Sequence, residues 1–245
     1  DATFDVVVVG AGITGLTAAM HLRLAGLQVA VVEMQRVGKG TTGSSTGHLD
    51  TDRDETWDTV IQKFGLESAR VVGEACKAAV SHVERWDREF SLQTDFRRVP
   101  AYLYTEEEAG FEEIERELEA ASRILIEAEL TRDQILPFPT LLSLRYPNQA
   151  RFNPMRYVCG LAERFVQAGG TIFEETRVVD VEEESAVRVI CNRGELRARA
   201  AVLSTHAPLL GTISMQARCA PYQSYVITAR VSETIEDALY WDTAD

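Results

Sequence analysis

A glycine pattern near the start of the chain constrains the fold more than any other feature. Gly10, Gly12 and Gly15 have the spacing G-x-G-x-x-G, directly after the apolar residues 6–9. A short β-branched run predicts a parallel strand that is buried on both faces. The first glycine allows a sharp turn, the second lets the backbone approach a pyrophosphate, and the third lets a helix pack closely. The pattern therefore predicts the opening strand, turn and helix of a dinucleotide-binding fold.

The residues after the glycines supply the context that such a site requires. A helix is expected over residues 13–25, because Gly26 is a typical C-terminal stop. Residues 28–32 predict a second strand, and Glu33 at its end can accept both hydroxyl groups of a ribose. The helix start favours phosphate through its N–H groups and its dipole. The alternative is a glycine-rich turn in an unrelated α/β protein.

A segment rich in glycine and hydroxyl residues follows the acid. Residues 34–49 have little hydrophobic periodicity, so one interpretation is an exposed surface loop. The other is a second cofactor-binding loop, because small residues let the backbone pass close to a ligand and hydroxyl groups add donors. We favour the second interpretation because the loop begins directly after the expected ribose-binding residue.

Composition and charge narrow the functional class. The chain has 245 residues, enough for one large or two modest domains, and its net charge of −13 disfavours binding to a nucleic-acid backbone. The four cysteines form no C-x-x-C pair, so we expect no metal or iron–sulfur site and no disulfide framework. A reducing, cytoplasmic location is the default expectation. No apolar run is long enough to predict a membrane span.

The order of the remaining elements predicts an interrupted fold. Helices are expected over residues 67–90 and from a capping box of Thr105 and Glu108 onward, with strands over residues 97–104 and 141–146. A second helix-and-strand-rich part follows. Its expected elements are a helix over 154–168 and strands over 171–174, 177–181, 186–191, 195–198, 200–204 and 222–232. The fold class is α/β: a Rossmann-type parallel sheet with a β-meander, interrupted by an α+β domain.

Several stretches together resemble the D-amino-acid-oxidase-like group of flavin oxidoreductases, which includes glycine oxidase and sarcosine oxidase. They are the glycine pattern, Glu33, the loop over residues 40–48, and residues 136–139, 148–157, 169–178 and 202–208. The resemblance implies an FAD-binding domain over residues 1–50 and 150–214. It implies a substrate domain over residues 51–149 and 215–245. Members of this group usually continue well beyond this length, so the substrate domain is expected to be incomplete.

The resemblance also implies a set of cofactor-binding residues. The glycine turn would hold the pyrophosphate, Glu33 the ribose, and the loop would run toward the flavin ring. A position where some relatives attach flavin covalently through histidine corresponds to Ser44, so non-covalent FAD is expected. The implied residues are Gly10, Ala11, Gly12, Ile13, Thr14, Gly15, Glu33, Met34, Gln35, Arg36, Thr41, Thr42, Gly43, Ser44, Ser45, Thr46, Gly47, His48, Val178, Thr205 and His206.

The function that the resemblance implies is oxidation of a C–N bond in an amine or amino acid, by hydride transfer to FAD. Oxygen or another acceptor would then take the electrons. One alternative is a flavin-binding module that needs a further segment or a partner chain. Another is an NAD(P)-dependent dehydrogenase that uses the same glycine pattern.

Catalytic residues are only weakly indicated. His48 ends the loop and is the one candidate, although a histidine bonded within a turn is an equally good interpretation. Tyr102, Tyr222 and Tyr225 lie on expected strands that could line a substrate pocket, or simply pack. His21 and His82 lie on expected helices and are interpreted as structural or exposed. No metal ligands are predicted.

Overall fold

The computed structural model describes residues 2–51, 55–183, 185–206, 225–230, 232 and 234–244. The chain divides into two compact units, each assembled from three separate stretches. The first unit comprises Asp1–Thr46, Phe90–Thr94 and Asn153–Val226, and the second comprises Gly47–Glu89, Asp95–Phe152 and Ile227–Asp245. The chain passes between these units after Thr46 and after Phe152, whereas domain changes are expected after residues 50 and 149; the domain assignment stays a prediction.

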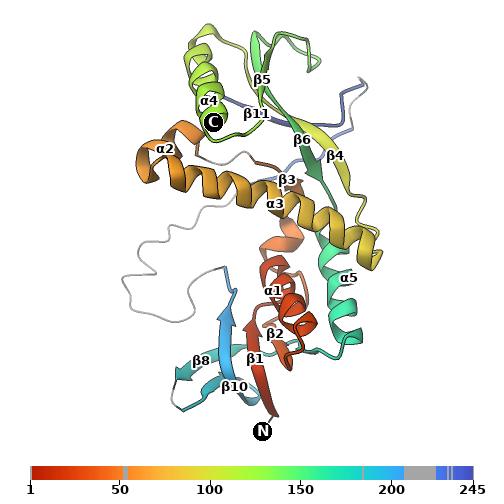
Figure 1. The fold of residues 1–245 in the computed structure, drawn as a ribbon. Coiled ribbons are helices and arrows are strands. Elements are labelled where there is room, and N and C mark those ends of the chain that lie inside the picture. The colour runs from red at the N-terminus through yellow and green to blue at the C-terminus, as the bar shows by residue number, and fades with distance from the viewer. Residues whose placement is uncertain are drawn as a thin grey trace. The chain divides into compact units, whose positions relative to one another are not determined.

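A sheet with the strand order β7-β2-β1-β10-β9-β8 organises the first unit (Figure 1). The first four of these strands are parallel, whereas β8 and β9 continue the sheet as an antiparallel meander. This confirms the predicted Rossmann-type class. The elements are β1 (Ala2–Val9), α1 (Ile13–Leu24), β2 (Val29–Val32), the 3-10 helix η1 (Thr41–Ser44), α5 (Pro154–Gln167), β7 (Thr171–Phe173), β8 (Val178–Glu183), β9 (Val187–Cys191) and β10 (Gly194–Leu203).

The central strand β1 is buried on both faces, as its β-branched run predicts. Val7 and Val9 pack with Ala30 and Val32 in one hydrophobic cluster, which also includes residues of the meander. Val6 and Val8 point to the opposite face, because side chains alternate along a strand, and both are buried as well. Helices α1 and α5 pack together, and α1 contacts β1 and β2. This packing fixes the start of α1 at the edge of the sheet where β1 ends.

Two strand predictions differ from the structure. Residues 195–198 and 200–204 were expected to form separate strands, but Gly194–Leu203 is the single strand β10. Residues 196–203 pair with β1 along nearly the whole strand, and residues 194–198 also pair with β9 on the other edge, so the pairing with β1 continues through both expected strands. Residues 225–230 have no regular secondary structure, contrary to the strand expected over 222–232. Residues 222–224 lie outside the described part of the chain.

The second unit contains a sheet with the order β11-β4-β6-β3, with β5 beside β6. Apolar residues of β4 and β6 pack against α2, α3 and α4 in one core. The predicted capping box is wrong: Thr105 is the last residue of β4, and α4 starts six residues later behind Gly110. The elements are β3 (His48–Leu49), α2 (Trp57–Phe64), α3 (Leu66–Phe90), β4 (Arg97–Thr105), the 3-10 helix η2 (Glu108–Gly110), α4 (Phe111–Arg123), β5 (Glu129–Thr131), β6 (Leu142–Arg151) and β11 (Leu239–Asp242).

Candidate cofactor site

Three parallel strands of the first unit end at one edge of the sheet. Val9, the last residue of β1, pairs with Val32 of β2 and with Leu203 of β10 in the register of the sheet. The Gly10 N–H donates to the Val32 carbonyl at 2.8 Å, and the Ser204 N–H donates to the Val9 carbonyl at 2.9 Å. The carboxyl edge of a parallel sheet is where α/β proteins bind their ligands. The glycine turn and the segments after β2 and β10 therefore converge at the expected place.

The glycine turn is too crowded for larger residues at its two ends. Gly10 has φ +106°, and a Cβ atom there would lie 2.6 Å from the Ser204 carbonyl oxygen. A Cβ atom on Gly15 would overlap the Gly10 carbonyl oxygen and lie 2.6 Å from Ser204 Oγ. Gly12 is different, because a Cβ atom there would meet only Thr42 Oγ1, at 3.1 Å. The first and third glycines are thus required by packing, whereas the second keeps the start of α1 open.

The start of α1 offers positive charge without an acidic neighbour in its own first turn. Gly12 is the N-cap residue, and it has no side chain to satisfy the helix N–H groups. The Ile13 N–H instead donates to Thr42 Oγ1 at 3.1 Å. A helix N-terminus of this kind favours anions such as phosphate, through both its N–H groups and its dipole. The chemistry of this end fits a pyrophosphate.

Glu33 is held in place by two backbone donors. Its Oε2 accepts from the Ala11 N–H at 2.8 Å, and its Oε1 accepts from the Gln35 N–H at 2.8 Å. A carboxylate has about four lone-pair sites, so both oxygens can still accept from ribose hydroxyl groups. The carboxylate is partly exposed directly after β2. The backbone therefore fixes its orientation, as the expected role of a ribose acceptor requires.

The loop after Glu33 is anchored in the first unit by its glycines. Gly38 has φ +72°, its N–H donates to the Ala11 carbonyl at 3.1 Å, and a Cβ atom there would lie 2.8 Å from Met155 and Val158 of α5. Gly43 packs directly on Gly38. In contrast, the neighbouring residues Met34, Gln35, Arg36, Thr41, Ser44, Ser45 and Thr46 are exposed. The backbone is fixed on the protein side while the hydroxyl-bearing side is open.

Ser204 is a site residue that the sequence interpretation missed. Its Oγ donates to the Val9 carbonyl at 2.8 Å and lies 3.4 Å from the Gly10 carbonyl. It was assigned only to the end of a strand, because the register of β10 against β1 is not visible in the sequence. Beyond it, Thr205 is partly buried, and His206 is exposed with φ +60°. Val178 is buried at the start of β8.

The family match agrees with this geometry. Residues 5–244 match the family described as DAO, FAD dependent oxidoreductase. The chain belongs to this family. The expected membership of an FAD-dependent oxidoreductase family, with FAD as the cofactor, is thereby confirmed, and the nicotinamide alternative is disfavoured. Non-covalent attachment and the individual roles of the site residues stay predictions.

Known relatives of this FAD-dependent family match nearly the whole chain. The putative Rieske 2Fe-2S iron-sulfur protein YhfW of Bacillus subtilis is 32% identical over 98% of this chain and 48% of its own length. Gamma-glutamylputrescine oxidoreductase of Escherichia coli is 24% identical over 97% of this chain and 58% of its own length. Glycine oxidase from Geobacillus kaustophilus shares the fold, with a TM-score of 0.68 and 18% identity over 83% of this chain and 55% of its own. The chain spans about half the length of these proteins.

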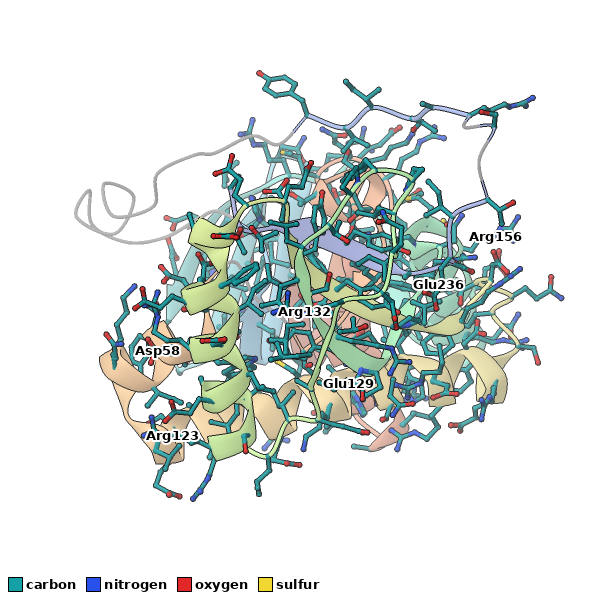
Figure 2. All side chains as sticks on the ribbon, turned by 90° about the horizontal axis from the view of Figure 1, so that it is seen from above. Asp58, Arg123, Glu129, Arg132, Arg156 and Glu236 are labelled. Carbon is teal, nitrogen blue, oxygen red and sulfur yellow. The ribbon has the colours of Figure 1, made fainter. Side chains whose placement is uncertain are left out.

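The catalytic candidates do not gather in the first unit. His48 begins β3 in the second unit, where its ring packs edge-on against Trp241 with centroids 5.4 Å apart, and burial lowers the pKa of its imidazole. Tyr102 is buried, and its hydroxyl donates to Glu236 at 3.1 Å; Glu236 is labelled in Figure 2. Tyr225 is 86% exposed, and Tyr222 lies outside the described residues. His48 therefore stays a prediction.

The described part of the chain has neither a cluster suited to a metal ion nor a helix suited to a membrane. No group of three or more histidine, cysteine, aspartate or glutamate side chains there is arranged to hold a metal ion. No helix there is both long and apolar enough to cross a bilayer. The cytoplasmic location predicted from composition stays a prediction.

Proposed function

We propose that the chain supplies the FAD-binding unit and part of the substrate domain of an enzyme that oxidises a C–N bond in an amine or amino acid. The main support for this proposal is the glycine turn, where the α1 start, Glu33 and Thr42 lie together at one edge of the sheet. The chain also belongs to the FAD-dependent family. The names of a gamma-glutamylputrescine oxidoreductase and a glycine oxidase among the relatives support a nitrogen-bearing substrate. When bound, FAD would accept a hydride from the carbon next to nitrogen.

In this proposal, the cofactor-binding residues have distinct roles. The α1 start and Thr42 hold the pyrophosphate, and Glu33 accepts from the adenosine ribose. Gln35, Arg36 and the backbone of Val178 lie beside the adenosine. The other proposed contacts to the ribityl chain and the flavin come from Thr41, Gly43, Ser44, Ser45, Thr46, Gly47, His48, Thr205 and His206. All of these residues except Gly47 and His48 belong to the first unit, which is the proposed FAD-binding domain, and the second unit is the proposed substrate domain.

The electron acceptor and the remaining substrate contacts come, in this proposal, from outside the chain. Supporting this, the chain spans 48% of the relative named as an iron-sulfur protein. An iron–sulfur cluster carried by a further segment or a partner chain is therefore a second candidate acceptor beside oxygen. Rapid reoxidation of the reduced flavin by a one-electron acceptor, with slow reoxidation by oxygen, would favour the cluster.

An absorption spectrum of the purified chain, before and after heat release of any chromophore, tests the proposal. Flavin bands, with FAD recovered in the supernatant, are the expected result and would also establish non-covalent attachment. A colourless protein that takes up no FAD on titration would overturn the proposed role of the first unit. A chromophore that stays with the denatured protein would overturn the non-covalent attachment alone.

A further inference from the structure

One sulfur atom of α5 packs against the loop that follows Glu33. Met155 lies in the first turn of α5, and its side chain is partly exposed. A Cβ atom built on Gly38 would lie 2.8 Å from Met155 Sδ, and a Cβ atom built on Gly43 would lie 3.1 Å from it. The sulfur therefore contacts the backbone of both glycines, and all three residues belong to the first unit.

Residues 38–43, called the 38–43 loop below, are joined in turn to the start of α1. The Gly38 N–H donates to the Ala11 carbonyl at 3.1 Å. Thr42, the residue before Gly43, accepts from the Ile13 N–H at 3.1 Å through its Oγ1. Both bonds reach the place where the pyrophosphate is proposed to bind. Any movement of the 38–43 loop away from α5 would therefore disturb the bond between Thr42 and Ile13.

The contact between Met155 and the loop suits a thioether but not an oxidised sulfur. The two glycines are themselves in contact, because a Cβ atom on Gly43 would lie 2.4 Å from the Gly38 carbonyl oxygen. Oxidation of methionine to its sulfoxide adds one oxygen atom and makes an apolar side chain polar and chiral. Glycine Cα atoms offer no hydrogen bond to that oxygen, and a buried polar group without a partner is costly. The sulfoxide is therefore expected to turn toward water and to leave the loop without this support.

Met155 combines access to solvent with this contact, unlike the other sulfur atoms described in the first unit. Met20 and Cys191 are buried, with 3% and 9% exposure. Met34 is 51% exposed, so a sulfoxide there stays solvated. Cys159, one turn further along α5, is exposed, but partial burial of its sulfur raises the pKa of its thiol. Thiols react as thiolates, whereas a thioether needs no deprotonation.

We propose that Met155 is an oxidation site through which hydrogen peroxide lowers the affinity of the protein for FAD. In this step the sulfur lone pair takes one oxygen atom from the peroxide, the O–O bond breaks and water leaves. The sulfur is oxidised and the peroxide is reduced. The inference rests on the proposed function with oxygen as the acceptor, because oxygen that takes two electrons and two protons becomes hydrogen peroxide. The enzyme would then be inhibited by its own product.

Peroxide treatment of the purified apoprotein tests the proposal. Peptide mass spectrometry is expected to find one added oxygen atom on Met155. FAD fluorescence quenching on titration should then give about tenfold weaker binding. The two methionine sulfoxide reductases together should restore the affinity, because each reduces one sulfoxide epimer. Hydrogen exchange at the Ile13 amide should become faster in the oxidised apoprotein, and this measurement needs no FAD.

Three variants, each compared before and after peroxide, assign the effect to this sulfur. Met155→Leu keeps the side-chain volume but has no sulfur, so its FAD affinity should not respond to peroxide. Met155→Gln carries a polar group at this position permanently, so its affinity should be low without peroxide. Cys159→Ser is the matched control on the same helix. It retains Met155 and should show the full response.

The competing interpretation is a methionine that only fills space. A sulfoxide on Met155 that changes neither FAD affinity nor Ile13 exchange would support that interpretation and overturn the proposal. An equal loss of affinity in Met155→Leu would assign the effect to another group. Oxidation of Met34 without oxidation of Met155 would show that peroxide does not reach this sulfur. A chain that takes up no FAD would refute the proposed function, whereas faster Ile13 exchange after oxidation would still retain Met155 as a control point of the loop.

Discussion

The carboxylate of Glu33 shows how a single residue can be prepared for its ligand. Two backbone N–H groups fix its orientation, and one of them belongs to the glycine turn. The proposed ribose site and the proposed pyrophosphate site are thus joined through Ala11. A change at Glu33 should therefore weaken FAD binding by removing the ribose acceptor and by loosening the turn at the same time.

Glu33→Ala is expected to weaken FAD binding by about 2 kcal/mol, or roughly thirtyfold in Kd, because hydrogen bonds to a charged group are lost. FAD fluorescence quenching on titration into the apoprotein measures this. The control is Glu163→Ala, at an exposed position of α5. Equal affinities in the two variants would contradict a ribose-binding role for Glu33.

Gly15→Ala tests the close contact between the turn and the segment after β10. Its Cβ atom would meet backbone and Ser204, neither of which is the free end of a flexible side chain. A loss of about 2 kcal/mol or more in unfolding free energy is expected from overpacking. Gly40→Ala is the matched control, because a Cβ atom there has nothing within 4 Å. Denaturant unfolding measures the unfolding free energy of both variants. Similar unfolding midpoints for the two variants would contradict the packing argument.

Among elements, α2 depends on a side chain from another helix. Glu117 of α4 is only 1% exposed, and its carboxylate accepts from the Trp57 N–H at 2.9 Å, the Asp58 N–H at 3.4 Å and the Tyr146 hydroxyl at 3.3 Å. Glu117 lies on the buried face of α4 beside apolar residues such as Ile114 and Ala121, and its bonds to the start of α2 account for a buried acid there. The carboxylate also complements the positive end of that helix.

Glu117→Ala should lower the unfolding free energy by about 3 kcal/mol, because it leaves buried donors of α2 and β6 without this acceptor. Glu119→Ala on the same helix, at an exposed position, should change it by less than about 0.5 kcal/mol. Chemical denaturation followed by circular dichroism measures both changes. A small effect at Glu117 would mean that another group or water replaces its carboxylate.

The strand β11 pairs with β4, and a tyrosine of each strand stacks on the other. We expect Tyr240 to lose its hydroxyl proton at a higher pH than an ordinary tyrosine. Tyr240 and Tyr102 stack with centroids 5.5 Å apart, and burial, followed by the nearby Glu236 charge, raises the pKa of Tyr240 to about 12. A raised folded-state pKa gives stability that is present below the unfolded value of about 10 and is lost as the pH rises toward 12. Tyrosinate absorbance should show this late step. Tyr240→Phe should remove it, whereas Tyr225→Phe should retain it.

Element-level errors in the sequence prediction have physical causes. The Thr105 and Glu108 pattern matches a capping box, but the pairing of β4 with β6 takes Thr105 into the sheet, and α4 begins only after Gly110. The helix α2 was missed because it is short and depends on Glu117. By contrast, the glycine turn was predictable because its requirements are local, whereas Ser204 requires the register between β1 and β10.

At the scale of the whole molecule, we expect that the chain alone can bind its cofactor but cannot reach full catalytic turnover. The residues proposed to bind the pyrophosphate and ribose lie in the first unit, whereas the chain spans only about half the length of its relatives. The chain alone is expected to bind FAD yet to oxidise amines and amino acids at least tenfold more slowly than an extended form. That form would carry the remaining half of a relative. Oxygen uptake across a substrate panel measures this, and full turnover by the chain alone would contradict it.

The pairing of β1 with β10 has a consequence for biosynthesis. Ser204 bonds to Val9 across 195 residues of sequence, so the glycine turn is completed by a segment that is synthesised much later. While the ribosome is still translating, β1 exposes an unpaired apolar edge of the kind that invites aggregation. The glycine turn of the nascent chain is therefore expected to reach its final form only after β10 emerges.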